Sequence, residues 1–458
     1  MFTVVFLVSG NDSGLLYAVS SGCGGRAPVH SGVCGNLGGL AIWPDMPYDL
    51  TVRDRNKFHR EDYHVPAGEK KFELSELFIA FEVIEDPRTS INRLHPLVSV
   101  LSIAVLAVLC GADGPTSIRG WAAARQQFLE RFLELPSGLP SRDVFRRVLC
   151  GLQPAAFQRC FNAWIEVMGA AIAGQTTTED AGSKKRHLAI DGKTLKGSRS
   201  NSKALGPLHL VSVWMSAKGI TLAQVPTDAK SNEITAIPQV LELIDVRGSV
   251  ITIDAMGAQV GIVKAITERG GDVVVCLKGN QGNLHKAVSE FVEKQLDNNF
   301  EGLVHETLHE SSNKKRHGRQ ESRTYIQFEI PKDFPLEEKW FGLKSFGVVV
   351  GETNSADKHT VEQSFYISSL PVGIAQFSKS IRSHWGIENT CHWSLDVTWR
   401  EDSLRTMERR MAENLGWIRR FSLSLLKQMS DKHSGAMRRR MCGWSEEYLT
   451  QVLIKLGT

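Results

Sequence analysis

The sequence predicts an α/β protein in which an all-helical domain precedes the sheet-forming part along the chain and a β-rich insertion lies late in that part. Three observations lead to this prediction. Apolar residues recur at helical spacing over residues 72–170, short β-branched runs alternate with amphipathic stretches from residue 186, and strand-like runs separated by polar turns fill about 300–370. With 458 residues, of which 42% are hydrophobic and 23% charged, the chain is long enough for two or three globular domains.

The first 65 or so residues differ from all that follows. They are rich in Gly and Ser and lack sustained periodicity, which is typical of poorly structured chain or of a start site placed too far upstream. Their apolar run at Val4–Val8 has no basic stretch before it, so it does not resemble a secretion signal. The most apolar stretch, residues 97–112, is short for a bilayer. We therefore expect a cytoplasmic protein without a membrane segment.

The helical domain is predicted over residues 72–170. Its most apolar helix runs from Leu97 to Cys110 and ends at Gly111, and Ser141 is placed to cap a later helix. A polar stretch at 174–185 has the composition of a linker.

Seven elements in succession predict the α/β part. We expect strands at 188–192, 208–215, 220–225, 250–254 and 272–277, with helices at 233–244 and 258–269. Three consecutive strands followed by helix, strand, helix and strand is the order of the ribonuclease-H-like fold, although other doubly wound sheets share such alternation. Helices return from Ile374, and residues 426–458 form a helical tail.

Three acidic residues in compact motifs carry the functional prediction. Asp191 follows His-Leu-Ala-Ile, Asp254 follows Val-Ile-Thr-Ile, and Glu388 lies in His-Trp-Gly-Ile-Glu-Asn-Thr, which has a helical pattern. One Asp at a strand end is usually a cap or turn residue, but two such sites with a Glu in one α/β unit indicate converging carboxylates. Their mutual repulsion implies a divalent metal. Two metals are the usual apparatus for cutting and joining phosphodiesters, so phosphoryl transfer on nucleic acid is the leading hypothesis.

Charge and cysteine content agree with this hypothesis without deciding it. The net charge is +4, yet five basic clusters occur, and together they favour a phosphate-backbone partner over scattered ion pairs. The clusters are residues 184–186, 314–316, 409–410, 419–420 and 438–440. The eight cysteines include no CxxC pair, and Cys391-His392 lacks a second half, so we expect no structural zinc.

The motifs resemble those of DDE transposases of bacterial insertion sequences, in particular the H-repeat-associated subgroup. The matching stretches include Ile-Asp-Gly-Lys around Asp191, Leu-Lys-Gly-Asn-Gln at 277–281, and His-Trp-Gly-Ile-Glu-Asn-Thr-Cys-His-Trp-Ser-Leu-Asp-Val at 384–397. The helical part also resembles this subgroup, through Asp86-Pro87-Arg88 and Pro-Ser-Arg-Asp at 140–143. The resemblance covers residues from about 75 to about 425.

The resemblance implies that Asp191, Asp254 and Glu388 are the catalytic, metal-binding triad of a domain spanning 186–425. It implies two Mg²⁺ ions, with Mn²⁺ able to substitute, and double-stranded DNA as the partner, both as transposon ends and as target. Hydrolysis would free the 3′ end of the element, which then attacks target DNA. A homodimer is expected in the synaptic complex, in a bacterial cytoplasm and on the nucleoid when DNA is bound.

The chain departs from the wider insertion-sequence signature around the Glu. That signature has Tyr, Arg and Lys where this chain has Ile381, His384 and Leu395. The subgroup's own His-Trp version is intact. Arg382, His384 and His392 are the candidates for the missing basic role and for contacts with DNA.

Further residues are predicted near the DNA, and each also has a purely structural interpretation. Lys193 and Lys196 either contact phosphates or are solvated turn lysines, while Lys278 and Gln281 are favoured near the metals. Trp385 and Trp393 are expected in the core, although stacking on a flipped base is conceivable. Specific recognition of the DNA end is placed in the helical domain, where arginines 119, 125, 142, 146 and 147 are available.

Three rival functions can be considered, and a feature of the sequence disfavours each of them. A transposase-derived protein that only binds DNA has no need of three like charges held together. A junction resolvase does not account for the helical domain and the β-rich insertion. A glycosidase needs two carboxylates and no basic surroundings.

Overall fold

The computed structural model describes residues 81–161, 185–200, 206–227, 233–298, 300–311, 320–336, 338–340, 342–355 and 358–454. The chain divides into two compact units, Met1–Lys70 and Lys71–Thr458, and every described residue belongs to the second. The predicted extension at 1–65, nearly all of the predicted linker and the basic cluster at 314–316 lie outside the described residues.

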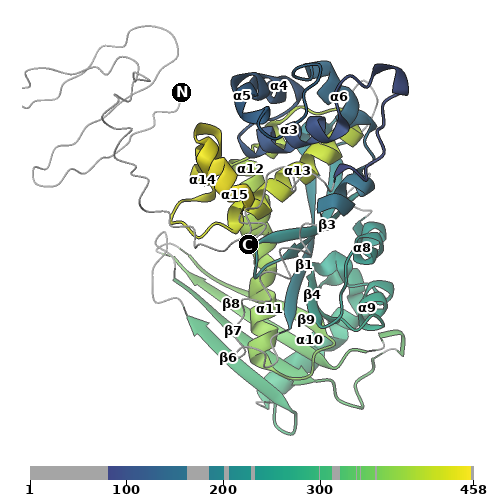
Figure 1. The fold of residues 1–458 in the computed structure, drawn as a ribbon. Helices are drawn as coiled ribbons and strands as arrows, with labels where there is room; N and C mark the ends of the chain where they lie inside the picture. The colour runs from purple at the N-terminus through teal and green to yellow at the C-terminus, as the bar shows by residue number, and fades with distance from the viewer. Residues whose placement is uncertain are drawn as a thin grey trace, which may run out of the picture. The chain divides into compact units, whose positions relative to one another are not determined.

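The described part is a mixed α/β structure with one large sheet and helices on both of its faces (Figure 1). The strands are β1 (Arg186–Leu195), β2 (Leu208–Met215), β3 (Ile220–Thr227), β4 (Ser249–Ile253), β5 (Asp272–Leu277), β6 (His305–Ser311), β7 (Gln320–Glu329), β8 (Ser345–Asn354) and β9 (His359–Ser368). The α-helices are α3 (Leu97–Leu109), α4 (Pro115–Ala124), α5 (Gln126–Leu129), α6 (Arg142–Gly151), α8 (Glu233–Glu242), α9 (Val260–Thr267), α10 (Gly282–Asp297), α11 (Ile374–Gly386), α12 (Trp393–Val397), α13 (Arg409–Lys427), α14 (Gly435–Trp444) and α15 (Glu446–Ile454).

The sheet has the strand order β3-β2-β1-β4-β5-β9-β8-β7-β6. β1, β2 and β3 are antiparallel neighbours, whereas β4 lies parallel to β1 and β5 parallel to β4. The five strands and two helices predicted between 188 and 277 are all present, with bounds that differ by a few residues at most. They could be predicted because buried strands in this part are nearly continuous apolar runs.

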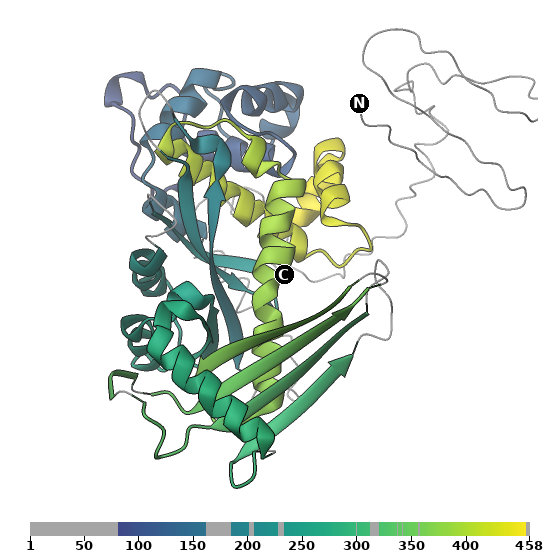
Figure 2. The same ribbon diagram turned by 180° about the vertical axis from the view of Figure 1, so that it is seen from behind.

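The strand-like runs predicted between 300 and 370 are also strands, and they continue the same sheet. β9 pairs antiparallel with β5, and β8, β7 and β6 follow outward (Figure 2). The sequence did not predict β6. This edge strand keeps most of its side chains exposed, so its sequence lacks the apolar alternation by which a half-buried strand is found.

Successive residues of β4 face opposite helical layers, because side chains alternate along a strand. Ile251 and Ile253 join the core that contains α8 and α9. Val250 instead packs with Phe377 and Ile381 of α11. The two faces of the sheet are therefore an α8/α9 face and an α11 face (Figure 1).

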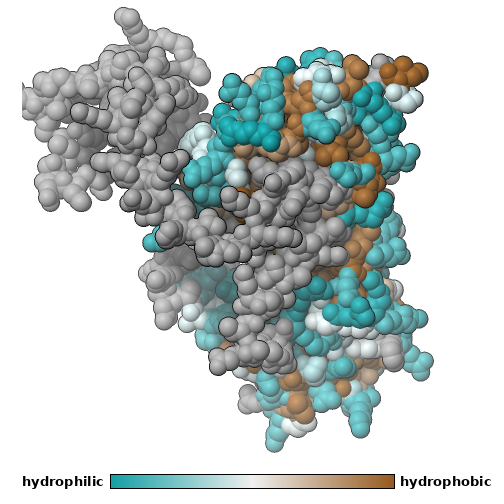
Figure 3. All heavy atoms as spheres, in the orientation of Figure 1, coloured by the Kyte–Doolittle hydropathy of each residue, from teal (hydrophilic) through white to brown (hydrophobic). Residues whose placement is uncertain are grey.

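The helices at the two ends of the described chain share one core. α3 is apolar on all sides and almost wholly buried, as predicted, and it packs against α4, α6 and α13. Ser141 caps α6, as predicted, by accepting a hydrogen bond from the Val144 N–H at 3.4 Å. Arg125 donates to the Gly443 carbonyl at 2.8 Å and so ties α14 to this group. In Figure 3, hydrophobic residues reach the surface on the helical part of the visible face, among hydrophilic ones.

None of the helices in the described ranges has the length and apolar character that crossing a membrane demands.

Candidate active site

Two of the three predicted acids lie side by side on the sheet. The last matched pair of β1 and β4 is Ile190 with Ile253, so Asp191 and Asp254 each follow it by one residue. Neighbouring parallel strands are about 4.8 Å apart. Both aspartates belong to the α11 face, since they continue the alternation of residues that face α11. β1 runs on to Leu195, so Asp191 lies inside its strand, and the expectation that it closes the strand was wrong. Only β4 ends directly before its Asp.

Asp254 leaves the sheet in a tight turn. Its carboxylate accepts a hydrogen bond from the Met256 N–H at 3.0 Å and so caps the 3₁₀ turn η6 (Ala255–Gly257). A strand-end Asp that caps a turn was the bland interpretation of this motif. In the structure Asp254 both caps this turn and lies beside Asp191.

Glu388 lies in a helix that is interrupted at this residue. α11 ends at Gly386, a π-helical segment η9 (Ile387–His392) follows, and α12 continues from Trp393. A π-turn takes up one extra residue and is frequent at functional sites. The predicted helix around Glu388 is therefore present, but with a shifted phase.

The phase shift aligns residues eight apart. In a regular α-helix such residues differ by about 80° around the axis, and one extra residue removes about 100°, which leaves about 20°. His384 and His392 accordingly both face the sheet. His384 Nδ1 lies 3.0 Å from Thr252 Oγ1 on β4, and His392 Nδ1 lies 3.4 Å from Asp191 Oδ2 on β1.

A chain of hydrogen bonds fastens α11 to the sheet beneath the acids. The Ser216 hydroxyl donates to the Ser383 carbonyl at 3.0 Å, so it can only accept from His187 Nδ1, also at 3.0 Å. Burial lowers the pKa of His187 to about 3 and that of His384 to about 4, so both rings are neutral. His187 Nε2 is then an acceptor for the Thr252 hydroxyl at 3.0 Å, and Thr252 accepts from His384 Nδ1–H. This tautomer assignment follows from the network.

Asp191 is a largely buried acid in the neighbourhood of other acids. Burial, joined by the charges of Asp254, Glu388 and Glu233, raises the pKa of Asp191 to about 7, although the hydrogen bond from the Gly192 N–H at 2.8 Å acts in the opposite direction. Its neighbour His392 gives no positive charge, because burial and the nearby Arg420 and Lys193 hold the pKa of that ring well below its usual value.

The donor set therefore fits a divalent cation, which prefers carboxylate oxygens. Within the described ranges, however, no three His, Cys, Asp or Glu side chains are already close enough together to hold a metal ion. Glu388 is exposed in this arrangement. Binding of a cation would have to draw the three carboxylates together.

Comparison with known proteins gives the family. A model described as "DDE_Tnp_1-associated" matches residues 78–165, and one described as "Transposase DDE domain" matches residues 182–425, more than half of the chain. The H repeat-associated putative transposase YhhI of Escherichia coli (strain K12) is 34% identical over 396 residues, which cover 84% of this chain and 99% of YhhI. The chain belongs to the DDE transposase family.

Other relatives agree with this assignment. The putative transposase YncI of Escherichia coli O157:H7 is 35% identical over 364 residues, 78% of this chain and 89% of YncI. The predicted resemblance to H-repeat-associated transposases is thereby confirmed.

A cryo-EM structure of the piggyBac transposase synaptic complex with hairpin DNA aligns with 83% of this chain and 75% of that chain, at 10% identity and a TM-score of 0.33.

The two lysines after Asp191 in this transposase differ sharply in exposure. Lys193 is 7% exposed, and its ammonium lies 2.7 Å from Asp396 Oδ1 and 3.5 Å from Asp402 Oδ1. A solvated turn lysine is therefore the wrong description of Lys193, and a DNA phosphate would have to displace these carboxylates. Lys196 is 74% exposed and lies 2.6 Å from Asp402 Oδ2.

The predicted Leu-Lys-Gly-Asn-Gln segment packs beside the turn that follows Asp254. Asn280 donates to the Ala255 carbonyl at 2.6 Å, and Gln281 donates to the Ala258 carbonyl at 2.8 Å. Lys278, directly after β5, is exposed. Gln281 is thus occupied in holding the Asp254 turn, while Lys278 faces solvent.

The candidates for the missing basic role are placed differently from one another. His384 contacts Thr252 and His392 contacts Asp191, but the lowered pKa of each ring keeps both histidines neutral. Arg382 is half-exposed, and its guanidinium lies 3.5 Å from Glu310 on β6. The arginine therefore points along the β6 side of α11.

Both tryptophans of the Glu388 motif are exposed, so the expectation that they lie in the core was wrong. Trp385 is 55% and Trp393 58% exposed. The same π-turn that directs His384 and His392 toward the sheet places these two residues, each one position later, on the outer side. Aromatic surface thus flanks Glu388 on its helix.

The sequence did not single out the buried pair behind Asp191. His209 on β2 and Glu233 at the start of α8 lie 2.6 Å apart, and both are almost fully buried. Thr252 was missed as well. Glu233 precedes an apolar helical run and so looks like an ordinary first-turn residue. The available sequence signal for the pair was His209, a histidine in an otherwise apolar strand.

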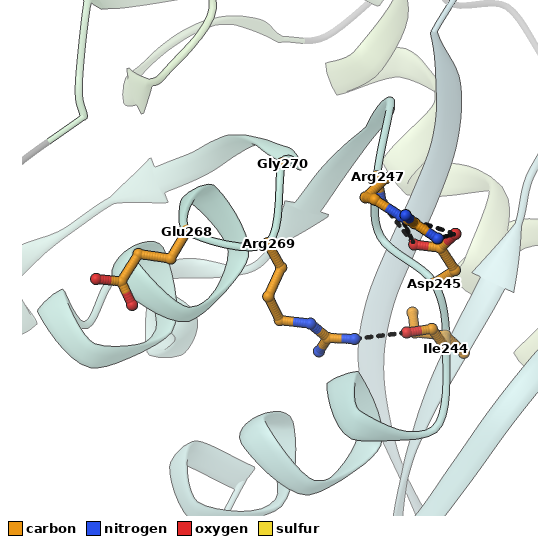
Figure 4. A pocket seen from close by; sticks show the side chains of 6 residues that line it. All are labelled: Ile244, Asp245, Arg247, Glu268, Arg269 and Gly270. Carbon is orange, nitrogen blue, oxygen red and sulfur yellow. Dashed lines mark hydrogen bonds and ion pairs between the residues drawn. The ribbon is translucent and has the colours of Figure 1, made fainter.

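A pocket of about 690 Å³ lies elsewhere, at the loops that precede β4 and β5 (Figure 4). These loops lie at the opposite ends of the strands from Asp254. Arg247 pairs with Asp245 at 3.1 Å, and Arg269 donates to the Ile244 carbonyl at 2.8 Å. Both arginines of this pocket are thus already paired. Because the pocket lies at the opposite ends of the strands from Asp254, it is not part of the candidate active site.

Proposed function

We propose that this chain cleaves DNA at the ends of an insertion sequence and transfers the freed strand to target DNA. The observation that carries the proposal is the adjacency of Asp191 and Asp254 on the same face of the sheet as the helix bearing Glu388. The raised pKa of Asp191 supports it, because burial beside further acids is unfavourable unless a cation joins them. Membership of the DDE transposase family agrees with this reaction.

We further propose a ribonuclease-H-like core for the domain at 186–425. Its support is an antiparallel β1–β2–β3 meander with β4 and β5 added in parallel at the other edge of β1. The strands β6–β9 would be the insertion at about 300–370. Residues 72–170 would form the helical domain that recognises the DNA end, and 426–458 the tail.

Two Mg²⁺ ions, or Mn²⁺ in their place, would be held by Asp191, Asp254 and Glu388. When bound, they would lower the pKa of the attacking water or 3′-hydroxyl and stabilise the leaving oxygen. The chain's own part is to place the ligands: the β1–β4 register sets the aspartates, and the Thr252 network sets α11. DDE transposases generally use divalent metal ions.

The DNA path is proposed along the exposed cations near the acids. Lys278 extends from the end of β5 and Lys196 from the end of β1, and both are accessible to a phosphate. Arg382 would act further along α11. In the helical part, Arg142 and Arg146 are exposed on α6, whereas Arg125 is engaged with Gly443. A dimer on paired ends, acting in the bacterial cytoplasm, completes the proposal.

The test is nicking of a DNA duplex that carries the end of the encoding element, with Mg²⁺ or Mn²⁺. Wild-type chain should cut, and Asp254→Ala should not. Arg247→Ala, at the opposite ends of the strands, is the matched control and should cut normally. The alternative, a transposase-derived protein that only binds DNA, predicts tight binding by all three proteins and no cleavage in either metal.

A further inference from the structure

Behind Asp191, on the α8/α9 face of the sheet, lies a buried hydrogen-bonded couple that the proposed reaction does not use. His209 Nε2 and Glu233 Oε1 are 2.6 Å apart, with side chains 2% and 5% exposed. His209 Nδ1 lies 2.9 Å from Thr194 Oγ1, its direct partner in the β1–β2 register. An acid is costly to bury, and an apolar pair of similar volume would fill the same space between β2 and α8.

This His209–Glu233 pair is built against the backbone that follows Asp191. A Cβ atom placed on Gly192 would lie 2.2 Å from His209 Nε2 and 2.4 Å from Glu233 Oε1. Any larger residue in place of Gly192 would therefore displace the pair. The Gly192 N–H in turn donates to Asp191 Oδ1 at 2.8 Å. The pair, the glycine and the Asp191 carboxylate are thus in continuous contact through the thickness of the sheet.

Glu233 also acts on the site through its charge. Its carboxylate lies against the Gly192 backbone on the α8/α9 face, one residue from Asp191, whose side chain belongs to the α11 face. The sheet separates Glu233 from the proposed metal site, so this acid cannot be a ligand, but a negative charge at this position attracts a cation.

We propose that the His209–Glu233 pair is a positioning pair for Asp191, which fixes the backbone at Gly192 and strengthens divalent cation binding from behind the sheet. The inference rests on the proposed function, because it takes Asp191 as a metal ligand. Groups that support metal ligands in this way change metal affinity about 10- to 100-fold when they are altered. The pair would thus set the metal concentration at which the enzyme works.

The experiment compares full-length wild type with Glu233→Gln, which keeps the shape of the side chain and removes its charge. Calorimetric titration with Mn²⁺ in the absence of DNA gives the metal affinity, and nicking at varied Mg²⁺ gives the half-saturating concentration. We expect both constants to rise about 10- to 100-fold in Glu233→Gln. The nicking rate at saturating Mg²⁺ should stay close to that of the wild type. Glu413→Gln, at a partly buried acid on α13, is the control and should change neither constant.

Unchanged constants in Glu233→Gln would overturn the inference. So would a lower rate at every Mg²⁺ concentration with the same half-saturation, since that is the result of a purely structural role. Glu233→Asp retains the charge but withdraws it from Gly192, and it should give a smaller rise in the same direction; it decides the matter if the Gln variant does not fold.

Failure of the proposed function gives a different result. In that case wild type binds Mn²⁺ no better than Asp254→Asn, and the inference falls with the site. If Asp254→Asn abolishes binding while Glu233→Gln leaves it intact, the site stands and only the role of the pair is overturned.

Discussion

Replacing Thr252 by valine should loosen the attachment of the Glu388-bearing helix to the sheet. The Thr252 hydroxyl bridges His187 Nε2 and His384 Nδ1, at 3.0 Å each, and Thr252 is 2% exposed. Valine has nearly the same shape but leaves one imidazole acceptor and one imidazole donor without a partner. Each loss costs about 1–2 kcal/mol, so we expect Thr252→Val to lower the free energy of unfolding by about 2–4 kcal/mol.

Thr252→Ser is the matched control. It keeps the hydroxyl and removes one buried methyl group, which costs about 1 kcal/mol. Urea unfolding of the metal-free full-length chain, followed by circular dichroism, measures both variants. The nicking rate should follow the same order, because α11 carries Glu388. The hydrogen-bond network would be refuted as an anchor if valine and serine cost the same, or if valine stays within about 0.5 kcal/mol of wild type.

Three further predictions concern charge and exposed surface. Lys193→Met should lower the free energy of unfolding by about 2 kcal/mol, because it leaves two partly buried carboxylates facing each other. Lys196→Met, at the exposed lysine, should change the free energy of unfolding by less than about 0.5 kcal/mol. Equal effects of the two substitutions in urea unfolding would contradict the burial of the Lys193 ion pair. The folded pKa of Asp191, about 7, is above its unfolded value of 3.8, so its stabilising contribution is complete below pH 4 and is lost as the pH rises to about 7. In EDTA, Asp191→Asn should therefore be more stable than wild type at pH 8 but not at pH 4, and a constant difference across thermal melts at both pH values would argue against the raised pKa. Trp385→Ala should weaken binding of a single-stranded oligo-dT about 5- to 100-fold in fluorescence anisotropy, because an exposed ring can stack on bases. The control is Trp444→Ala on α14, where the ring is 66% exposed and no weakening is expected; no change in either variant would exclude stacking at Trp385.

The sequence predicted the strands around the acids well, for a physical reason. Runs such as Val250–Ile253 are apolar because the strand is covered on both faces, and this pattern is local. The same locality explains the failure at β6, which has no buried face. The adjacency of the two acids comes from the parallel pairing of β1 with β4, in which Ile190 and Ile253 are partners and each precedes an Asp.

Other features depend on contacts that are distant in sequence. Lys193 is buried only because Asp396 and Asp402, about 200 residues later, surround its ammonium. Arg419 and Arg420 counted as a basic cluster in the sequence, yet both are buried on α13 against Glu401. A count of cations along the chain therefore overstated the surface available to DNA.

The exposure of the tryptophans could not be obtained from helical periodicity. A regular helix places Trp385 and Trp393 about 80° apart, and the π-turn changes that angle. A π-turn has no dependable sequence pattern. The motif around Glu388 was thus identified correctly while the orientation of its aromatic residues was not.

The central claim is that the carboxylates hold the catalytic cation, and Asp254→Cys tests it most directly. A thiolate binds the softer Mn²⁺ better than Mg²⁺. In the DNA-end nicking assay, wild type should be active with both metals, and the cysteine variant should regain activity only with Mn²⁺. A cysteine variant whose activity relative to wild type is the same in Mg²⁺ and Mn²⁺ would contradict the claim that Asp254 binds the metal.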